Sequence, residues 1–310
     1  MLNASAFDPY PTRLSEPRRP IPREEPVIHD AAGHHDGPLS AAQLERFRRD
    51  GFLVLEGFFR PAQVRQFLDD LDAYQHDRET LRRPGVITEP DSGAIRSIFS
   101  IHRLSARFDA VTRDARLIDL AGQILGSDVY IHQSRLNRKP AFSGRGFDWH
   151  SDFETWHAED GMPVMRCFSV SVNLTENNDL NGPLLLVPGS HETFYPTVGA
   201  TPARYWETSL KRQNVGVPEI SHLEDATQSR GIVPARGGPG TVTLFDCNTL
   251  HASSDNPSPV SRANLFFVFN SVHNRLGEPY AAPAPRPEWV AAREHTETLT
   301  VLRSRRISAA

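Results

Sequence analysis

The chain has 310 residues, with 34 Lys and Arg against 38 Asp and Glu and a formal net charge of −4. This length permits one large β-domain or two smaller domains. The balanced charge, with no long run of one sign, argues against a nucleic-acid partner. No apolar run approaches the ~20 residues that span a bilayer, so we expect no association with a membrane. The start of the chain lacks the apolar core of a secretory signal, which predicts a cytoplasmic protein.

The cysteine content is low. Cys167 and Cys247 are the two cysteines, and both lie in or beside strand-like apolar segments. Such positions suit small buried hydrophobic side chains better than a disulfide framework. We therefore expect two free thiols, consistent with a reducing compartment.

Proline and charged residues dominate the first part of the chain. Residues 1–38 contain seven prolines and no sustained apolar period, which predicts an extended or flexible arm. Ser40 then begins a capping-box pattern with Gln43 at the third helical position. We expect a helix from there through Arg49, ended by Gly51.

A strand and two further helices are expected next. Residues 52–55 are continuously apolar and predict a strand. Pro61 fits the first position of a helix, and apolar residues recur after it at i, i+3, i+4 and i+7 spacing. A third helix is expected over 116–125, closed by Gly126.

From Val129 onwards, short apolar runs alternate with Gly, Pro and Asn, which is typical of an antiparallel sandwich or a closed barrel. Asn181-Gly182 is a hairpin signal between two of these runs. The pattern predicts a mainly β protein with flanking helices, in which a helical N-terminal half packs against a jelly-roll core. Strands are expected over residues 168–174, 184–187, 241–245 and 265–269.

The segment 147–157 holds the candidate metal ligands. His150 and Asp152 are two residues apart, and in an extended chain this spacing places both side chains on one face. His251, which follows the predicted strand 241–245, is the candidate for a third ligand. Two histidines and one carboxylate on one face leave coordination positions open, as in non-haem Fe(II) oxygenases. The alternative for His251 is a hydrogen-bonded histidine at a strand end.

Two further residues strengthen the metal hypothesis. Arg262 lies eleven residues after His251, and a buried guanidinium can pair bidentately with a dicarboxylate cosubstrate. Ser253 can add a hydroxyl group to the same carboxylate. The alternative for Arg262 is an ordinary surface ion pair.

Other histidines compete with this assignment. His157 and Glu159 repeat the His-x-carboxylate spacing, but the turn-rich residues after them make a poor platform for metal ligands. For His191, which follows a predicted strand and turn, we expect a structural hydrogen bond. His34 and His35 lie in the predicted arm, where we expect them to bind nothing specific.

One motif is far more distinctive than the His-x-Asp pair. It is the 17-residue stretch Phe147-x-Trp-His-Ser-Asp-Phe-Glu-Thr-Trp-His-x-Glu-Asp-Gly-Met-Pro163. With this motif, and with matching segments along nearly its whole length, the chain resembles the phytanoyl-CoA dioxygenase-like Fe(II)/2-oxoglutarate oxygenases, and within them the bacterial ectoine hydroxylases. The other matching segments are 8–13, 49–59, 188–191, 251–257 and 264–270.

The resemblance implies a role for each matched position. It implies a double-stranded β-helix, cupin-like core, with residues 39–310 forming a single dioxygenase domain after the arm. The implied iron ligands are His150, Asp152 and His251. The implied contacts to 2-oxoglutarate are Arg262, Ser253, Lys139 and Asn137. The implied contacts to the substrate are Gln133, Trp156, Phe245, Phe266 and Arg286.

The resemblance also implies the reaction. Ectoine would be hydroxylated to 5-hydroxyectoine, a compatible solute made under osmotic stress, with Fe(II), 2-oxoglutarate and O2 required and with succinate and CO2 released by a homodimer. Ectoine is a small zwitterion with a delocalised amidinium, so aromatic faces and a few polar anchors suit it. Two alternatives stay open: a related dioxygenase that acts on another small amino-acid-like substrate, and a non-catalytic ligand-binding jelly roll.

Overall fold

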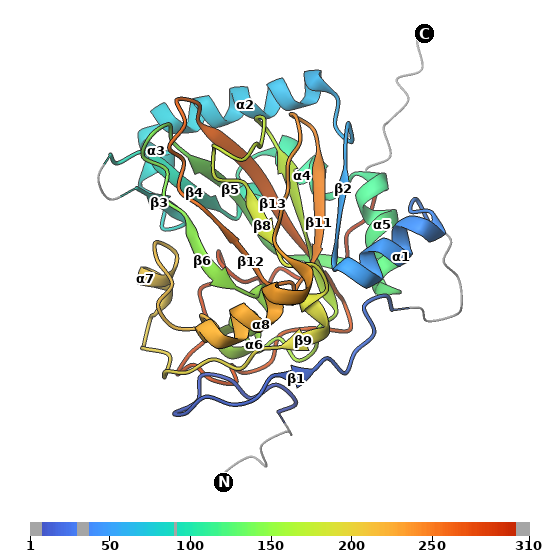
Figure 1. Ribbon diagram of the computed structural model, residues 1–310. Helices are drawn as coiled ribbons and strands as arrows, with labels where there is room; N and C mark the ends of the chain where they lie inside the picture. Colours follow the sequence, from blue (N-terminus) through green and yellow to red (C-terminus); the bar gives the residue numbers. More distant parts are fainter. Residues whose placement is uncertain (1–7, 30–36, 90–91, 302–310) are drawn as a thin grey trace.

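Two antiparallel sheets dominate the computed structural model, which describes residues 8–29, 37–89 and 92–301 (Figure 1). The larger sheet has seven strands, in the order β2 (Phe52–Leu55), β11 (Val242–Asp246), β7 (Cys167–Asn173), β13 (Arg262–Ser271), β5 (Val129–Lys139), β4 (Ile95–Phe99) and β3 (Val86–Thr88). The smaller sheet has four, in the order β10 (Val233–Pro234), β8 (Leu184–Leu186), β12 (His251–Ser253) and β6 (Phe147–His150). A short pair joins β1 (Ile21–Pro22) to β9 (Thr193–Phe194).

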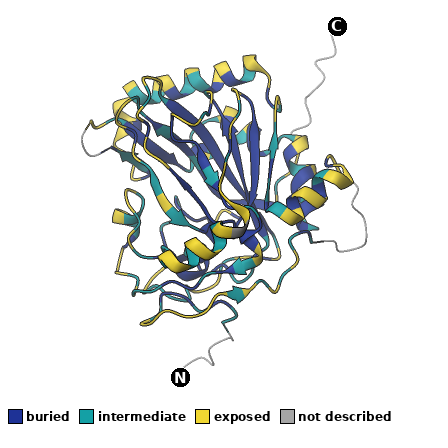
Figure 2. Cartoon of the chain, in the orientation of Figure 1, coloured by how far each residue is buried: buried dark blue, intermediate teal, exposed yellow. Residues whose placement is uncertain are grey.

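Four of the eight helices in the described part of the chain pack against one face of the larger sheet. The helices are α1 (Ala41–Asp50), α2 (Pro61–His76), α3 (Arg78–Leu81), α4 (Ala106–Thr112), α5 (Ala115–Leu125), α6 (Asp152–Asp160), α7 (Trp206–Ser209) and α8 (Ile220–Arg230), with 3₁₀ turns at Ile101–Arg103 and Ser190–Glu192. Apolar side chains of α1, α2, α4 and α5 form one buried cluster with those of β5, β7, β11 and β13. Figure 2 shows these strands buried and the outer faces of the helices exposed.

Local signals explain why the predicted helices form. The Ser40 hydroxyl accepts a hydrogen bond from the Gln43 backbone N–H, and the Gln43 side chain accepts one from the Ser40 N–H. This completes the predicted capping box at the start of α1. Gly51 ends the helix with φ of +80°, a conformation that favours glycine. The predicted helices at 61 and over 116–125 are likewise confirmed as α2 and α5.

A bulge in β5 decides which side chains face the space between the two sheets. Val268 pairs with Gln133 and Phe269 pairs with Ile131, so His132 is an extra residue in β5. An extra residue reverses the alternation of side chains along a strand. Ile131 therefore lies in the helix-covered core. The side chains of β5 beyond the bulge that face the interior between the sheets are Gln133, Arg135, Asn137 and Lys139.

One turn prediction is wrong in its topology. Gly182 has the expected positive φ, +71°, so a turn does form at Asn181-Gly182. However, β7 before it pairs with β11 and β13, whereas β8 after it pairs with β10 and β12. The turn carries the chain from the larger to the smaller sheet and does not close a hairpin. Strands β3 and β4 were not predicted.

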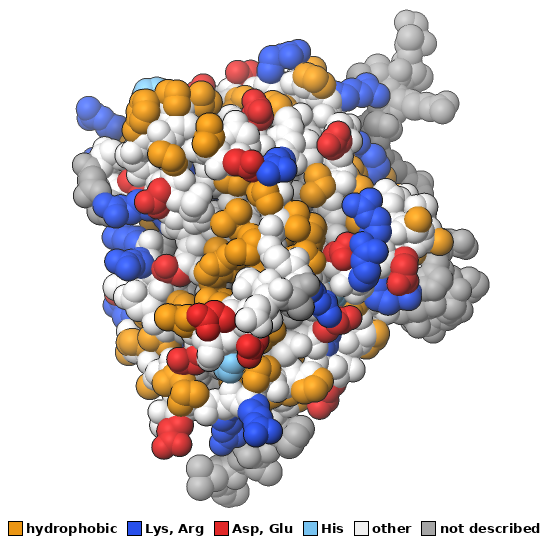
Figure 3. Space-filling model, viewed as in Figure 1, with side chains coloured by type: hydrophobic (Ala, Val, Ile, Leu, Met, Phe, Trp, Pro, Cys, Tyr) orange, Lys and Arg blue, Asp and Glu red, His pale blue; other side chains and the backbone are white. Residues whose placement is uncertain are grey.

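The cysteines and the helices agree with two predictions made from the sequence. Cys167 and Cys247 are buried free thiols, as predicted. Within the described residues, no helix combines the length and apolarity needed to cross a membrane. Figure 3 shows hydrophobic side chains gathered in the middle of one face, with acidic and basic side chains around them.

The described part of the N-terminal arm packs against α6. Residues 8–29 run in an extended path along the end of the molecule that carries α6 and β9 (Figure 1). The Tyr10 ring is fully buried and meets the Phe153 ring edge-on at 5.4 Å. The Arg13 guanidinium donates to both carboxylate oxygens of Glu154, at 2.7 and 2.9 Å. Residues 1–7 and 30–36 of the predicted arm, including His34 and His35, lie outside the described residues.

We expect Arg13→Ala to lower the free energy of unfolding by about 3–5 kcal/mol, because it leaves the buried carboxylates of Glu154 and Glu159 without their cation. Denaturant unfolding followed by circular dichroism measures this change. Arg18→Ala is the control, since Arg18 lies on the same arm with an exposed side chain, and its effect should stay within about 0.5 kcal/mol. Equal effects of the two substitutions would show that the buried ion pair does not stabilise the fold.

Candidate active site

Three elements bring the predicted metal ligands together. His150 is the last residue of β6, Asp152 is the first residue of α6, and His251 is the first residue of β12. Strands β6 and β12 are antiparallel neighbours in which His150 and His251 lie directly opposite each other. Their rings therefore lie side by side, tilted by 51° to each other, with centroids 4.2 Å apart. The sheet register places two residues that are 101 positions apart at a single point.

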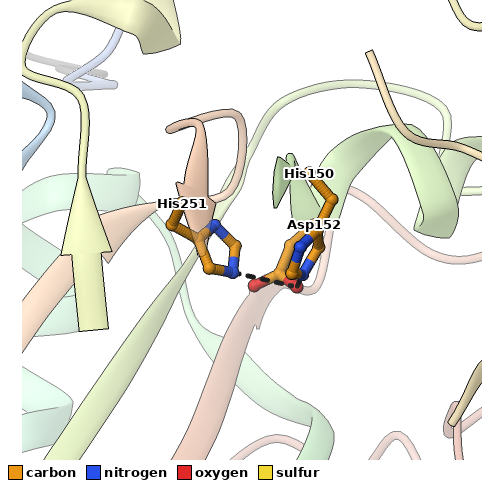
Figure 4. A group of neighbouring side chains, drawn as sticks. All are labelled: His150, Asp152 and His251. Atoms are coloured by element: carbon orange, nitrogen blue, oxygen red, sulfur yellow. Dashed lines mark ion pairs between the residues drawn. The ribbon is translucent and has the colours of Figure 1, made fainter. Parts of the chain in front are cut away.

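The donor atoms of the three side chains converge. The Nε2 atoms of His150 and His251 each lie 3.8 Å from Oδ1 of Asp152, and all three donor atoms lie within 4.8 Å of one another. Figure 4 shows the three side chains pointing toward one another from β6, α6 and β12. Two imidazole nitrogens and one carboxylate oxygen at such separations form the donor set of a non-haem iron site.

Backbone carbonyls hold both imidazoles in the orientation that a metal needs. His150 Nδ1 donates to the Asp148 carbonyl at 2.7 Å, and His251 Nδ1 donates to the Thr249 carbonyl at 2.9 Å. Because a carbonyl oxygen can only accept, each Nδ1 carries a proton, and each Nε2 faces Asp152. Burial lowers the pKa of His251 to about 4, so its ring is neutral near pH 7 and free to bind a cation.

The carboxylate reaches the site by a different route from the one predicted. The sequence reasoning placed His150 and Asp152 on one face of an extended segment, but the strand ends at His150. Ser151 caps α6 by accepting the Glu154 N–H at 3.1 Å, and Asp152 begins the helix. A helix start favours a negative charge. Burial by itself would raise the pKa of Asp152. The neighbouring His251, His150 and Arg135 and a hydrogen bond from Ser169 nevertheless keep that pKa below its usual value.

Two cavities meet at the triad. The first, here called the strand-side cavity, is lined by Arg135, Asn137, Phe147, His150, Leu184, His251, Ala252, Ser253, Arg262 and Phe266. The second, here called the helix-side cavity, is lined by Ser97, Phe99, Gln133, Arg135, Phe147, His150, Asp152, Thr155, Trp156, Glu159, Ser209, Leu210, Gln213 and Arg286. His150 borders both, so a metal held by the triad would face each cavity.

The strand-side cavity has the charge that a dicarboxylate requires. Arg262 is only 2% exposed, and within the described part of the chain its guanidinium has no ion-pair partner and its Nε has no hydrogen-bond partner. Burial lowers its pKa to about 10, so Arg262 remains charged at neutral pH. Lys139 donates to the Ser253 hydroxyl at 2.8 Å and to the Ser254 carbonyl. A buried cation without a counter-charge fits the distal carboxylate of 2-oxoglutarate.

Lys139 and Asn137 are the other two residues predicted to contact 2-oxoglutarate. Burial and the neighbouring Arg262 lower the pKa of Lys139 to about 6, so the amine is mostly neutral at pH 7 in the free protein. A bound dianion would favour its charged form. Asn137 accepts a hydrogen bond from the Ser97 hydroxyl at 2.7 Å. Of the four residues predicted to contact 2-oxoglutarate, Asn137, Ser253 and Arg262 line the strand-side cavity. Lys139 does not line it, but is hydrogen-bonded to Ser253.

The predicted substrate contacts divide between the cavities. Gln133, Trp156 and Arg286 line the helix-side cavity, whereas Phe266 lines the strand-side cavity. Phe245 lines neither cavity; it is fully buried, with its ring centroid 5.1 Å from that of His251. Its position suits a support behind the metal ligand better than direct contact with a substrate.

The competing histidines have structural partners. His157 Nδ1 donates to the Met162 carbonyl at 2.7 Å, and its Nε2 lies 2.9 Å from Asp8. Both His157 and Glu159 lie within α6, which ends at Asp160, at the start of the turn-rich segment predicted after them. His191 Nε2 donates to the Arg48 carbonyl at 3.0 Å, which is the predicted structural hydrogen bond. Among the described residues, the one group of three or more potential metal ligands is the His150–Asp152–His251 set.

Two charged residues of the site were missed from the sequence. Arg135 lines both cavities, and its guanidinium lies over the Phe266 ring at 5.0 Å. Glu159 was considered only as a rival metal ligand, yet it lines the helix-side cavity. No local motif marks Arg135, and Glu159, although it is a specified position of the motif over residues 147–163, was given no role in the cavity. Alternation along β5 from Gln133 would have placed Arg135 on the same face.

Comparison with known proteins agrees with this geometry. The family model for phytanoyl-CoA dioxygenase (PhyH) matches residues 47–264. The chain belongs to the phytanoyl-CoA dioxygenase family. It is 48% identical to the ectoine dioxygenase of Bordetella bronchiseptica over 289 residues, which is 93% of this chain and 94% of that protein. It is 49% identical to the ectoine dioxygenase of Halomonas elongata over 287 residues, 92% of this chain and 86% of that protein.

Solved structures of the phytanoyl-CoA dioxygenase family show the same fold. The crystal structure of EctD from S. alaskensis with 2-oxoglutarate and 5-hydroxyectoine has a TM-score of 0.85 and 44% identity, and the match covers 95% of this chain and 98% of that chain. The structure of the same protein with bound Fe has a TM-score of 0.84. The predicted family and the predicted jelly-roll fold class are thus confirmed.

Proposed function

We propose that this dioxygenase hydroxylates ectoine to 5-hydroxyectoine and converts 2-oxoglutarate and O2 to succinate and CO2 in the same turnover. The observation that carries the proposal is the meeting of two cavities at the His150–Asp152–His251 donor set. One cavity holds the buried Arg262, which forms an ion pair with none of the described residues, and the other holds Gln133 beside an aromatic ring. The ectoine dioxygenases that resemble the chain over most of its length support the choice of substrate.

Each group of residues has a part in this reaction. His150, Asp152 and His251 would hold iron(II), and Arg262, Ser253, Lys139 and Asn137 would hold 2-oxoglutarate. When bound, iron(II) supplies the activation of O2 that couples the oxidation of 2-oxoglutarate to the insertion of one oxygen atom into a C–H bond of the substrate. The protein orients both organic molecules and excludes water from them.

The helix-side cavity suits a small zwitterion. Trp156 offers an aromatic face for the delocalised amidinium of ectoine, and Gln133 offers an amide. Gln133 already donates to the Val290 carbonyl at 2.9 Å, which fixes the side chain and leaves its oxygen available. Arg286 uses Nε and Nη2 to bind Asp160, so Nη1 is its remaining group for a carboxylate. Phe266 and Phe245 add apolar bulk on the side of His251.

The test is one assay with two products. Anaerobically prepared Fe(II) protein is given 2-oxoglutarate, O2 and ectoine, and succinate and 5-hydroxyectoine are quantified together. We expect equal amounts of the two. Succinate without 5-hydroxyectoine would keep the oxygenase chemistry and reject ectoine in favour of another small amino-acid-like substrate. Formation of neither succinate nor 5-hydroxyectoine would be the outcome that favours the non-catalytic ligand-binding jelly roll.

We also propose the organisation in which the enzyme works. Residues 39–310 form a single dioxygenase domain, preceded by the arm of residues 1–38, and two such chains form a homodimer in the cytoplasm. The family model supports the domain assignment because its match, residues 47–264, lies within these bounds. Light scattering in solution tests the homodimer: a monomer mass would reject it.

A further inference from the structure

The buried charges around α6 do not balance. Glu154, Glu159 and Asp160 contribute three carboxylates, each at most 2% exposed, and the guanidinium groups that meet them are those of Arg13 and Arg286. Arg13 forms its bidentate pair with Glu154, and Arg286 forms its bidentate pair with Asp160. Glu159 is the carboxylate without a cation of its own.

Glu159 shares both of its neighbouring guanidinium groups: Arg13 also binds Glu154, and the nearby Arg286 binds Asp160, while burial raises the pKa of the Glu159 carboxyl. Its Oε1 accepts from Arg13 Nη2 at 3.1 Å, the same nitrogen that donates to Glu154 at 2.9 Å. No other ion pair or hydrogen bond to the Glu159 carboxylate exists within residues 8–29, 37–89 and 92–301. His132, the nearby imidazole, lies 3.5 Å from Asp160 instead. A buried carboxylate with so little compensation is costly unless another cation arrives.

The Glu159 side chain borders the helix-side cavity, in the company of His150 and Asp152. It lies one helical turn beyond Thr155 and Trp156, which border the same cavity from α6. On β5 the cavity is lined by Arg135, whose guanidinium has no ion-pair partner in the described part of the chain. The helix-side cavity is therefore bordered by the carboxylate of Glu159, which is only partly compensated, and by the guanidinium of Arg135, which pairs with no described carboxylate.

We propose that Glu159 determines substrate specificity by binding the cationic side of the substrate, with Arg13 holding the carboxylate in place. The inference rests on the proposed function and extends it, because ectoine carries an amidinium that would supply the missing positive charge. A charge-assisted hydrogen bond from an amidinium N–H to the free oxygen of Glu159 would satisfy both groups. A neutral ring in the same place would leave Glu159 unpaired and would be rejected.

Glu159→Gln tests the proposal, because glutamine keeps the size of the side chain and an oxygen for Arg13 but removes the charge. Two ligands are compared: ectoine, and an analogue in which a neutral cyclic amide replaces the amidinium. We expect kcat/KM for ectoine to fall about 10- to 100-fold, while the neutral analogue binds more tightly than to the wild type, because the substitution removes the charge that this analogue leaves unpaired. The KM for 2-oxoglutarate should not change.

Glu154→Gln is the matched control. Glu154 belongs to the same buried cluster but does not line the cavity, so a structural effect should weaken ectoine and the analogue by the same factor. The proposal is overturned if Glu159→Gln also weakens both ligands equally, or if it leaves ectoine turnover unchanged. A wild-type enzyme that does not hydroxylate ectoine would overturn the proposed function instead, before the variants are compared.

Discussion

Asp152→Ala should abolish the formation of both succinate and 5-hydroxyectoine. The substitution removes the one carboxylate from the donor set and leaves two imidazoles, whose Nε2 atoms then lack the anion that balances a divalent cation. Replacing a residue that only orients a metal ligand weakens metal binding by about 10- to 100-fold. For the ligand itself we expect a loss of iron(II) affinity of more than about 100-fold.

Iron(II) binding, measured anaerobically by equilibrium titration, separates this effect from misfolding. Circular dichroism should give the same spectrum as for the wild type, because Ser151, not Asp152, caps α6. Asp148→Ala is the control: Asp148 is exposed, and it holds His150 through its backbone carbonyl, which the substitution retains. Product formation by the Asp152 variant at a rate near that of the wild type would refute the triad.

The sequence predicted those parts of the fold whose signals are local. The capping box at Ser40 and the positive φ at Gly51 need only neighbouring residues, and α1 begins and ends where they indicate. The turn at Asn181-Gly182 also formed, but its local chemistry does not say which strands pair. That choice depends on β11 and β13, which enter the larger sheet on either side of β7 and keep β8 out of it.

The site was predictable to a similar degree. A two-residue spacing identified His150 and Asp152, although the chain turns from strand to helix between them, because their side chains converge in either conformation. The opposed register of β6 and β12 was not predictable, yet it is what brings His251 to the same point. Glu159 was missed as a cavity residue because its significance lies in a charge balance with Arg13, 146 positions away in the sequence.

Arg262→Ala should raise the KM for 2-oxoglutarate at least about 30-fold and change the KM for ectoine less than about twofold. Truncating one partner of a buried, hydrogen-bonded charge pair costs about 2–5 kcal/mol, which is about 30-fold or more in affinity. The two effects differ because Arg262 lines the strand-side cavity and does not line the helix-side cavity. Steady-state kinetics with each ligand varied in turn measures both constants. Similar increases in the two constants would contradict the assignment.

The unfolding stability of the Arg262→Ala variant provides a second and independent test of the role of Arg262. Arg13 and Arg262 are both buried arginines, but Arg13 binds two carboxylates, whereas no described residue pairs with Arg262. Removing Arg13 leaves anions uncompensated, while removing Arg262 removes an uncompensated cation. Without 2-oxoglutarate, Arg262→Ala should therefore unfold at the same denaturant concentration as the wild type or at a higher one. Adding 2-oxoglutarate to the iron-loaded proteins should stabilise the wild type and leave the variant nearly unchanged, because only a protein that binds a ligand is stabilised by it.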